Sequence, residues 1–193
     1  PPHCASLRTF DEMNTTISCG LKALAATGFE LPADRLVIYN FEQRESPLLD
    51  NAALELFRRH EVWDYSATNV AWLAGRDVRA KHVPIGFVPE LKRIEKVTPN
   101  IDVLFYGLVN NRRRHILDSL RAAGLKVVEL VGCYGSERDE LISRAKIVLN
   151  MHFYETAIFE MVRCSYLFAN EVCVVSEESV DVPPEIDKAI KLV

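Results

Sequence analysis

A chain of 193 residues can form one large domain or two small ones. With 49% hydrophobic residues, 26% charged residues and a net charge of −4, it has no global field that would attract nucleic acid or an anionic membrane. No apolar run approaches the ~20 residues of a membrane span, and five cysteines without CxxC spacing favour reduced thiols in a cytoplasmic protein over disulfides or a zinc site.

The first half of the chain predicts short alternating elements. A helical spacing of apolar residues indicates a helix that includes Met13, Ile17, Leu21 and Leu24. Strands are expected at residues 36–39, at 62–63 and around 82–85, with a helix at 48–59. Ser66 can act as the N-cap of one more helix through Val70 and Leu73.

The second half has the clearer rhythm. Apolar runs predict strands at residues 101–106, 125–131, 147–151 and 172–175. Asn110 or Asn111 can cap a helix that Gly124 ends. Strand and helix alternate four times with short connections, which predicts a parallel sheet with right-handed crossovers.

Two more helices and a linker complete this division of the chain. Ser136 and Asp139 have the spacing of a capping box, and apolar side chains recur at helical spacing from about 155 to 169. Residues 89–99 are charged, lie between prolines and show weak periodicity, as a linker between domains does. We therefore expect an N-terminal domain at 1–88, a linker at 89–99 and a C-terminal domain at 100–193.

Polar residues collect directly after the predicted strands of the second half. Ligands of open parallel sheets bind beyond the carboxyl ends of the strands, so these residues are candidates for a binding site. They include Gly107 and Asn110 after the first strand, Tyr134 after the second, Asn150 and His152 at the third, and Glu177 after the fourth.

Three consecutive arginines at the start of a predicted helix indicate an anion site. The amino end of a helix is already partly positive, so cations are unfavourable there unless an anion lies between them. A diphosphate bound by Arg112 and Arg113 fits, since guanidinium groups bind phosphate in bidentate fashion. The alternative is a solvated basic turn, and we favour it for Arg114, paired with Asp118.

Glu160 and His152 each have two interpretations. Glu160 can bind ribose hydroxyls, or it can pair with Arg163 three residues on. His152 directly follows a buried strand, which suits either a catalytic role or a structural one.

In the first half, Glu42 and Asp64 follow predicted strands and are candidates for the side of the site that receives an acceptor. For Asp64 and Ser66 the alternative is helix capping, which we prefer for Ser66.

Several common motifs are absent from the sequence. It contains no GxGxxG, no GxxxxGK[ST], no GxSxG and no HExxH. It also lacks Asp-x-Asp, the usual metal–diphosphate clamp of single-domain glycosyltransferases. A metal-independent mechanism is therefore expected, with arginines and a helix dipole stabilising a leaving diphosphate.

Several short segments resemble a known family. They are residues 39–43 (YNFEQ), 62–66 (VWDYS), 84–87 (PIGF), 102–107 (DVLFYG), 111–113 (NRR), 132–138 (GCYGSER), 149–152 (LNMH), 159–163 (FEMVR) and 175–177 (VSE). Together they resemble a bacterial glycosyltransferase-like family with the GT-B fold, related to the CgeB-like and group 1 glycosyltransferases.

That resemblance implies two Rossmann-like α/β halves with parallel sheets, the N-terminal one reduced. The donor, a nucleoside diphosphate sugar, would bind the C-terminal half, and an unknown glycan, lipid or protein acceptor would enter from the N-terminal half. Group 1 enzymes use two glutamates eight positions apart on the donor sugar and the ribose; Glu160 matches the second, and His152 stands at the first.

The sequence thus predicts a glycosyltransferase without a bound cofactor. The expected roles are catalysis for His152 and donor binding for Gly107, Asn110, Arg112, Arg113, Tyr134, Asn150, Glu160 and Glu177. The alternative is a non-catalytic module of this fold that binds a nucleotide or a glycan within a larger assembly.

Overall fold

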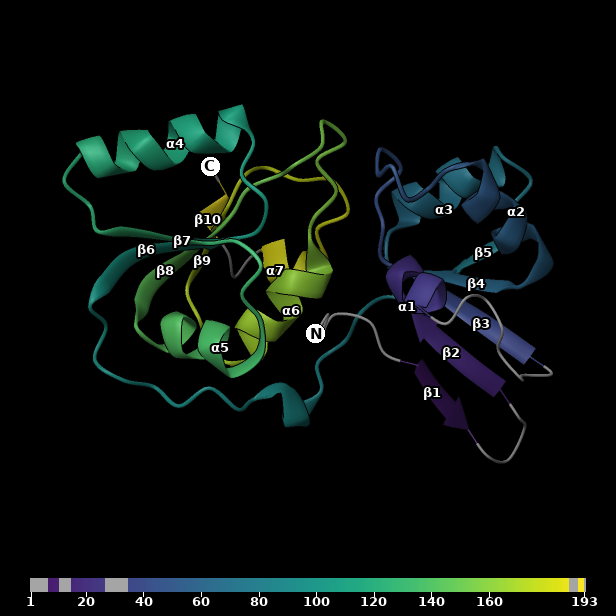
Figure 1. Ribbon diagram of the computed structural model, residues 1–193, viewed down its shortest axis with the longest axis horizontal. Helices are drawn as coiled ribbons and strands as arrows, with labels where there is room; N and C mark the ends of the chain where they lie inside the picture. The colour runs from purple at the N-terminus through teal and green to yellow at the C-terminus, as the bar shows by residue number, and fades with distance from the viewer. Residues whose placement is uncertain (1–6, 11–14, 27–34, 188–190, 193) are drawn as a thin grey trace. The chain divides into compact units, whose positions relative to one another are not determined.

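The computed structural model describes residues 7–10, 15–26, 35–187 and 191–192. The chain divides into two compact units, Pro1–Ile85 and Gly86–Val193. Each unit holds one five-stranded sheet with helices beside it (Figure 1). Both units are therefore α/β, and their mainly parallel sheets are Rossmann-like, as expected from the alternating pattern.

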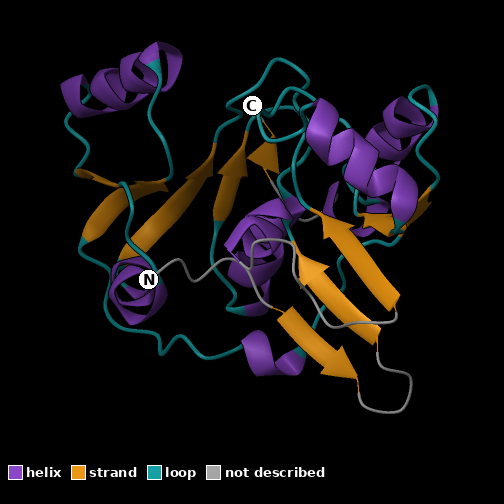
Figure 2. Ribbon diagram, turned by 45° about the vertical axis from the view of Figure 1, so that its right-hand side comes forward, coloured by secondary structure: helices purple, strands orange, loops and turns teal. Residues whose placement is uncertain are grey.

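The sheet of the first unit has the strand order β1-β2-β3-β4-β5. Its strands are β1 (Leu7–Phe10), β2 (Thr15–Cys19), β3 (Arg35–Asn40), β4 (Glu61–Asp64) and β5 (Ala80–His82). β1 is antiparallel to β2, and the remaining pairs are parallel; β1, β2 and β3 lie side by side in both views (Figures 1 and 2).

Three helices accompany this sheet: α1 (Leu21–Ala26), α2 (Asn51–Arg59) and α3 (Ala67–Ala74). The core lies between them and the strands, where Leu24, Ile38, Phe57, Val62 and Leu73 are at most 1% exposed. Ser66 caps α3 by accepting from Asn69 N, as predicted.

The expected helix across residues 13–24 is wrong in its first part. Ile17 lies in β2, because the β-branched run Thr15, Thr16 and Ile17 pairs with β3. Gly20, with φ +87°, ends the strand, and the helix begins only at Leu21. Met13 lies outside the described residues.

The second sheet is parallel throughout, in the order β10-β9-β8-β6-β7. Its strands are β6 (Ile101–Tyr106), β7 (Val127–Leu130), β8 (Ala145–Asn150), β9 (Val174–Ser176) and β10 (Lys191–Leu192). The four predicted strands are thus neighbouring and parallel, within three residues of their expected bounds.

Helices cover both faces of this sheet. They are α4 (Asn111–Ala122), α5 (Gly135–Ser143), α6 (Met161–Ala169) and α7 (Pro184–Asp187), with a 3₁₀ turn, η1 (Pro89–Leu91). Figure 1 shows α4 on one face and α5 and α6 on the opposite face. The chain leaves β6 for β7 on one side and returns to β8 on the other, so the strand order reverses between β6 and β8.

Two helix starts differ from the predictions. α6 begins at Met161 and not near 155, because Ile158 forms a bridge with Val180 and Phe159 N donates to Val180 O at 3.0 Å. The Ser136–Asp139 capping box is absent: α5 follows Tyr134 without a side-chain cap, and Asp139 accepts from Tyr166 Oη at 2.7 Å instead.

The segment expected to be a linker, residues 89–99, belongs to the second unit and is bound to α6. Arg93 N and Ile94 N donate to Asn170 Oδ1 at 2.9 and 2.8 Å, and Asn170 Nδ2 donates to Leu91 O at 2.8 Å. Among the described helices, none combines the length and the apolar character that crossing a bilayer requires.

Candidate functional site

The carboxyl ends of β6 and β8 mark the place where the strand order of the second sheet reverses. Open α/β sheets bind ligands in the crevice outside such a point, since the loops that follow the two strands diverge there. Gly107 follows β6, and His152 lies two positions after Asn150, the last residue of β8. The topology therefore brings these three predicted site residues to one edge.

Position 107 requires a glycine, both because of its backbone conformation and because a neighbouring side chain lies close to it. Its φ of +135° is a conformation that L side chains rarely adopt, and a Cβ there would lie 3.2 Å from Arg163 Nη2. The glycine thus allows the chain to pass close to a guanidinium group of the protein itself.

Arg112 lies in the first turn of α4, and its side chain is 49% exposed. Asn110 caps this helix, since its Oδ1 accepts from Arg113 N at 2.9 Å. The Arg112 guanidinium binds both oxygens of Glu177, one at 3.1 Å, and also the carbonyl of His152. Arg112 is therefore positioned by two partners and remains open to solvent.

Arg113 corrects our expectation of two equivalent phosphate ligands. Its side chain is 2% exposed, and it donates to Leu108 O at 2.6 Å, to His152 O at 3.3 Å and to Met151 O. Its guanidinium also lies 5.1 Å from the ring centroid of Phe105. Burial lowers the pKa of Arg113 to about 10. Its donors tie the loop after β8 to the loop after β6, so this arginine is structural.

Glu160 pairs with Arg163 at 2.9 Å, which is the alternative that its sequence position left open, and lies 3.5 Å from Arg113 Nη2. Asn150 is 1% exposed, donates to Ser176 Oγ at 3.0 Å and accepts from Arg163 Nη1 at 3.3 Å. Asn150 and Glu160 therefore form a polar network with Arg113 and Arg163 beneath the sheet edge.

Glu177 connects this network to the surface. One of its carboxylate oxygens accepts from His152 N at 2.6 Å, and both contact Arg112. Burial alone would raise the pKa of Glu177, but these hydrogen bonds outweigh that effect and lower it. Glu177 is thus a carboxylate that holds Arg112 and the backbone of His152 together.

The His152 side chain combines burial with an unused polar atom. The residue is 4% exposed, and burial lowers its pKa below the usual 6.5, which favours the neutral ring at pH 7. Nε2 lies 2.8 Å from Ser179 Oγ and 3.2 Å from the carbonyl of Glu178. Nδ1 is buried and has no hydrogen-bond partner in the part of the chain that the structure describes.

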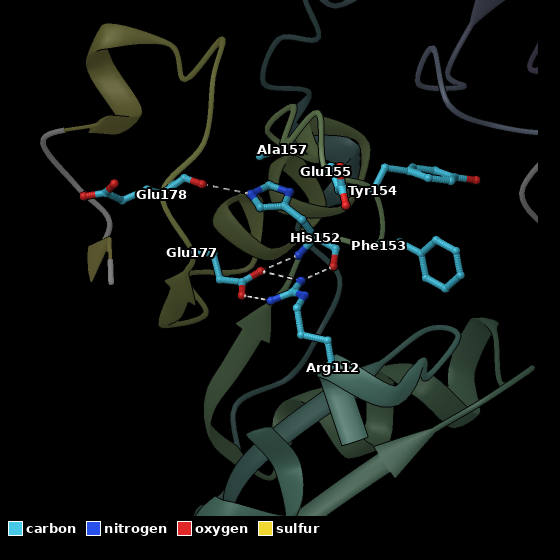
Figure 3. A pocket seen from close by; sticks show the side chains of 8 residues that line it. All are labelled: Arg112, His152, Phe153, Tyr154, Glu155, Ala157, Glu177 and Glu178. Carbon is cyan, nitrogen blue, oxygen red and sulfur yellow. Dashed lines mark hydrogen bonds and ion pairs between the residues drawn. The ribbon is translucent and has the colours of Figure 1, made fainter. Parts of the chain in front are cut away.

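A pocket of about 410 Å³ opens at this edge (Figure 3). Its lining comes from α4, from the loop after β8 and from the loop after β9: Arg112, His152, Phe153, Tyr154, Glu155, Ala157, Glu177 and Glu178. Tyr154, Glu155 and Glu178 follow the predicted strands and were expected at this edge, whereas sequence reasoning missed Phe153 and Ala157. The adjacency of Phe153 and Ala157 to these residues was a usable signal, because residues that follow parallel strands gather at one edge.

The structure places two residues differently from the prediction, Tyr134 relative to the pocket and Arg114 in its ion pair. Tyr134 precedes α5, is 46% exposed and does not line this pocket. Arg114 pairs with Glu129 at 2.8 Å and not with Asp118, which pairs with Arg121 at 2.9 Å. Arg114 is exposed, as we expected for an arginine in a solvated turn.

Asp64, an expected acceptor-side residue, is completely buried in the first unit. Its carboxylate accepts from Asn40 Nδ2 at 2.6 Å and from Ser66 N at 2.8 Å, and Asn69 Nδ2 lies 3.3 Å away. Burial raises the pKa of Asp64 to about 6, although these hydrogen bonds oppose the shift. The carboxylate joins β3, β4 and α3, so its role is structural and the acceptor-side prediction is wrong.

Glu42, the second acceptor-side candidate, lies in the loop after β3. Its carboxylate accepts from Ser46 Oγ at 2.7 Å, and its carbonyl accepts from Asn40 Nδ2 and Asn69 Nδ2, both at 2.9 Å. Glu42 is partly exposed and shapes the loop that covers the buried carboxylate. Within the described part of the chain, no three His, Cys, Asp or Glu side chains converge as a metal site would need.

Similar proteins come from a virus. An uncharacterized protein of Acanthamoeba polyphaga mimivirus is 29% identical over 151 residues, which is 75% of this chain and 49% of that protein. A second mimivirus protein, also uncharacterized, is 27% identical over 165 residues, 82% of this chain and 58% of its own length. A third is 38% identical over 93 residues, 47% of this chain and 13% of that protein.

The chain therefore spans less than two thirds of the length of each of these relatives. No protein-family model matches the sequence.

Proposed function

We propose that the second unit binds a nucleoside diphosphate sugar and that the protein transfers the sugar to an acceptor. The observation that carries this proposal is the pocket beside the strand-order reversal, where half-exposed Arg112 lines the same cavity as His152, whose Nδ1 has no hydrogen-bond partner among the described residues. The guanidinium of Arg112 suits a phosphate, and the neutral ring of His152 suits a hydroxyl.

The diphosphate would lie against Arg112 at the amino end of α4. The first amides of a helix have no intrahelical partner, so they add donors and partial positive charge beside the guanidinium. Arg113, whose donors are already bound to carbonyls, is not part of this contact. The sugar would extend toward His152, whose neutral ring can accept a hydrogen bond.

The transfer forms one bond and breaks one bond. The acceptor oxygen bonds to the anomeric carbon, the bond from that carbon to the diphosphate oxygen breaks, and the nucleoside diphosphate leaves with the bonding electrons. The proton of the acceptor hydroxyl passes to a base. A GT-B arrangement, with the acceptor bound by the first unit, accommodates this chemistry and agrees with the two Rossmann-like units. The acceptor would be a glycan, a lipid or a protein.

A non-catalytic binding module is the second candidate. The observation that favours it is that Arg113, Asn150 and Glu160 are bound to other groups of the protein, which leaves fewer polar groups to act on a ligand than the sequence suggested. The module would bind a nucleotide or a glycan, and only the first candidate predicts release of nucleoside diphosphate when an acceptor is added.

The test is a thermal-shift screen against UDP, GDP, CDP and dTDP and their sugars, followed by titration calorimetry on Arg112→Ala. Loss of one charge-assisted hydrogen bond, ~1.5–3 kcal/mol, should weaken the best ligand roughly ten- to a hundredfold. Arg114→Ala is the matched control, since it removes a neighbouring arginine that binds Glu129, and it should leave the affinity unchanged. Binding should also persist in EDTA.

If no nucleoside diphosphate or sugar nucleotide stabilises the protein, or if Arg112→Ala and Arg114→Ala bind equally well, the donor site is wrong. Binding without turnover of any sugar nucleotide, with or without acceptor extracts, would favour the module.

A further inference from the structure

The hydrogen bonds of His152 determine which ring nitrogen carries the proton. The Glu178 carbonyl can only accept, and the Ser179 hydroxyl donates its own proton to Glu177 O at 2.9 Å. Ser179 Oγ, 2.8 Å from Nε2, must therefore accept from the ring. Since both neighbours accept, the proton of neutral His152 lies on Nε2 and Nδ1 bears only a lone pair.

The loop that supplies these acceptors is itself held in place. Val180 N donates to Ala157 O at 2.9 Å, and Phe159 N donates back to Val180 O at 3.0 Å. Glu177 N, at the start of the loop, donates to Asn150 O at 3.1 Å. Ser179 is thus fixed relative to the chain that follows His152, and its contact with Nε2 follows from the fold.

A buried acceptor without a partner is costly and uncommon, so Nδ1 requires an explanation. Figure 3 shows Nε2 turned toward Glu178 and the Nδ1 edge of the ring turned the other way, on the side of Glu155. These residues line the same pocket as the ring. A donor from a ligand in that pocket would satisfy Nδ1.

The charges around the pocket restrict what that donor can be. The charge of Arg112 is offset by its ion pair with Glu177, so the charged side chains left around the ring are those of Glu155 and Glu178. An anionic group next to the ring would be repelled, whereas an uncharged hydroxyl can donate to Nδ1.

We propose that Ser179 is a positioning residue, which together with the Glu178 carbonyl keeps the His152 proton on Nε2, so that Nδ1 accepts a hydrogen bond from an uncharged hydroxyl of the bound ligand. The identity of that ligand as the sugar of a sugar nucleotide rests on the proposed function. The tautomer of His152 and its dependence on Ser179 do not rest on that function.

The first test reads the tautomer without any ligand. Long-range ¹H–¹⁵N correlation spectra of the labelled full chain at pH 7.5 should show His152 with a protonated Nε2 and a bare Nδ1, with the signals assigned by their loss in His152→Gln. A ring protonated on Nδ1, or on both nitrogens, would overturn the proposal.

The second test removes the hydroxyl of Ser179. Ser179→Ala should lower the ratio of the Nε2–H to the Nδ1–H tautomer about two- to tenfold, as expected for one hydrogen bond. Ser179→Thr keeps the hydroxyl and should restore the wild-type ratio, which an effect on folding alone would not do. An unchanged ratio in a folded Ser179→Ala, or a Ser179→Thr that behaves like it, would contradict the role. If Ser179→Ala does not fold, the tautomer measured in the wild type still tests the proposal.

The third test adds UDP-glucose, GDP-mannose or dTDP-glucose, with each nucleoside diphosphate alone as the control. The sugar nucleotide that binds should shift the Nδ1 resonance, and its nucleoside diphosphate should not. Binding without a shift of Nδ1 would overturn the hydroxyl contact. If none of these probes binds, the proposed function fails, while the first two tests still judge the role of Ser179.

Discussion

At the scale of single residues, Arg112 and Arg113 show that neighbours in the chain can have opposite environments. Arg112 is half-exposed beside the pocket, whereas Arg113 points into the unit and donates to three backbone carbonyls. Adjacent residues on a helix differ by about 100° in direction, so only one of the two can face the sheet. The sequence offers both the same chemistry, and the direction of each side chain divides their roles.

We expect Arg113→Ala to lower the free energy of unfolding of the second unit by about 3–5 kcal/mol, because three backbone carbonyls lose this donor and Glu160 loses one of its two arginine partners. Urea titration followed by circular dichroism measures this loss. Arg114→Ala, one residue along and exposed, should leave the midpoint close to that of the wild type. If the Arg113→Ala protein is as stable as the control but binds nucleotide weakly, Arg113 binds the ligand and is not structural.

At the scale of elements, the ends of strands decide where polar groups gather. In the first unit the ends of β3 and β4 and the start of α3 share one buried carboxylate, that of Asp64. In the second unit the ends of β6 and β8 share the guanidinium of Arg113. Each sheet therefore closes its carboxyl edge with a buried charged group that binds backbone or amide partners.

The buried carboxylate predicts a pH dependence of stability. Folding raises the pKa of Asp64 from 3.8 to about 6, so the folded state binds its proton more tightly. Its contribution to stability is fully present below pH 3.8 and is lost as the pH rises through 6, by roughly 3 kcal/mol in total.

The measurement compares unfolding free energies of the wild type and Asp64→Asn between pH 4 and 7.5. Since other carboxylates titrate in both proteins, the difference between the two curves isolates Asp64, and it should move in favour of the variant as the pH rises. A difference that does not change with pH would show that the carboxyl titrates normally when folded.

At the scale of the whole molecule, the chain between the two units is attached to one of them. Asn170, 4% exposed at the end of α6, holds residues 91–94 through three hydrogen bonds, and Glu171 pairs with Lys92 and Lys96. The division between the units falls between Ile85 and Gly86. Residues 91–96 are therefore held by contacts within the second unit.

Hydrogen exchange tests this attachment. The amides of Arg93 and Ile94 should be protected in the wild type, and Asn170→Ala should speed their exchange about tenfold, since both donate to the lost oxygen. Asn170→Asp keeps an oxygen at that position and should retain most of the protection. Rapid exchange of both amides in the wild type would show that the segment is a free linker.

Much of the fold could be predicted from the sequence because its signals are local. Apolar runs that end in glycine predict buried strands, and Asn110 and Ser66 cap helices through atoms only three residues away. The strand–helix alternation then requires a parallel sheet, since short connections of one hand leave few other arrangements. The predicted strands of the second unit accordingly pair in parallel.

Contacts between residues far apart in the chain decided the rest. Residues 155–160 have a helical apolar pattern, but the bridge from Ile158 to Val180 makes them irregular. The sequence alone determined which residues reach the sheet edge, because each follows a strand. Only the tertiary structure decided which of them bind other groups of the protein. Buried polar groups must be paired, so Arg113, Asn150 and Asp64 bind the protein itself, and Arg112 and His152 line the pocket.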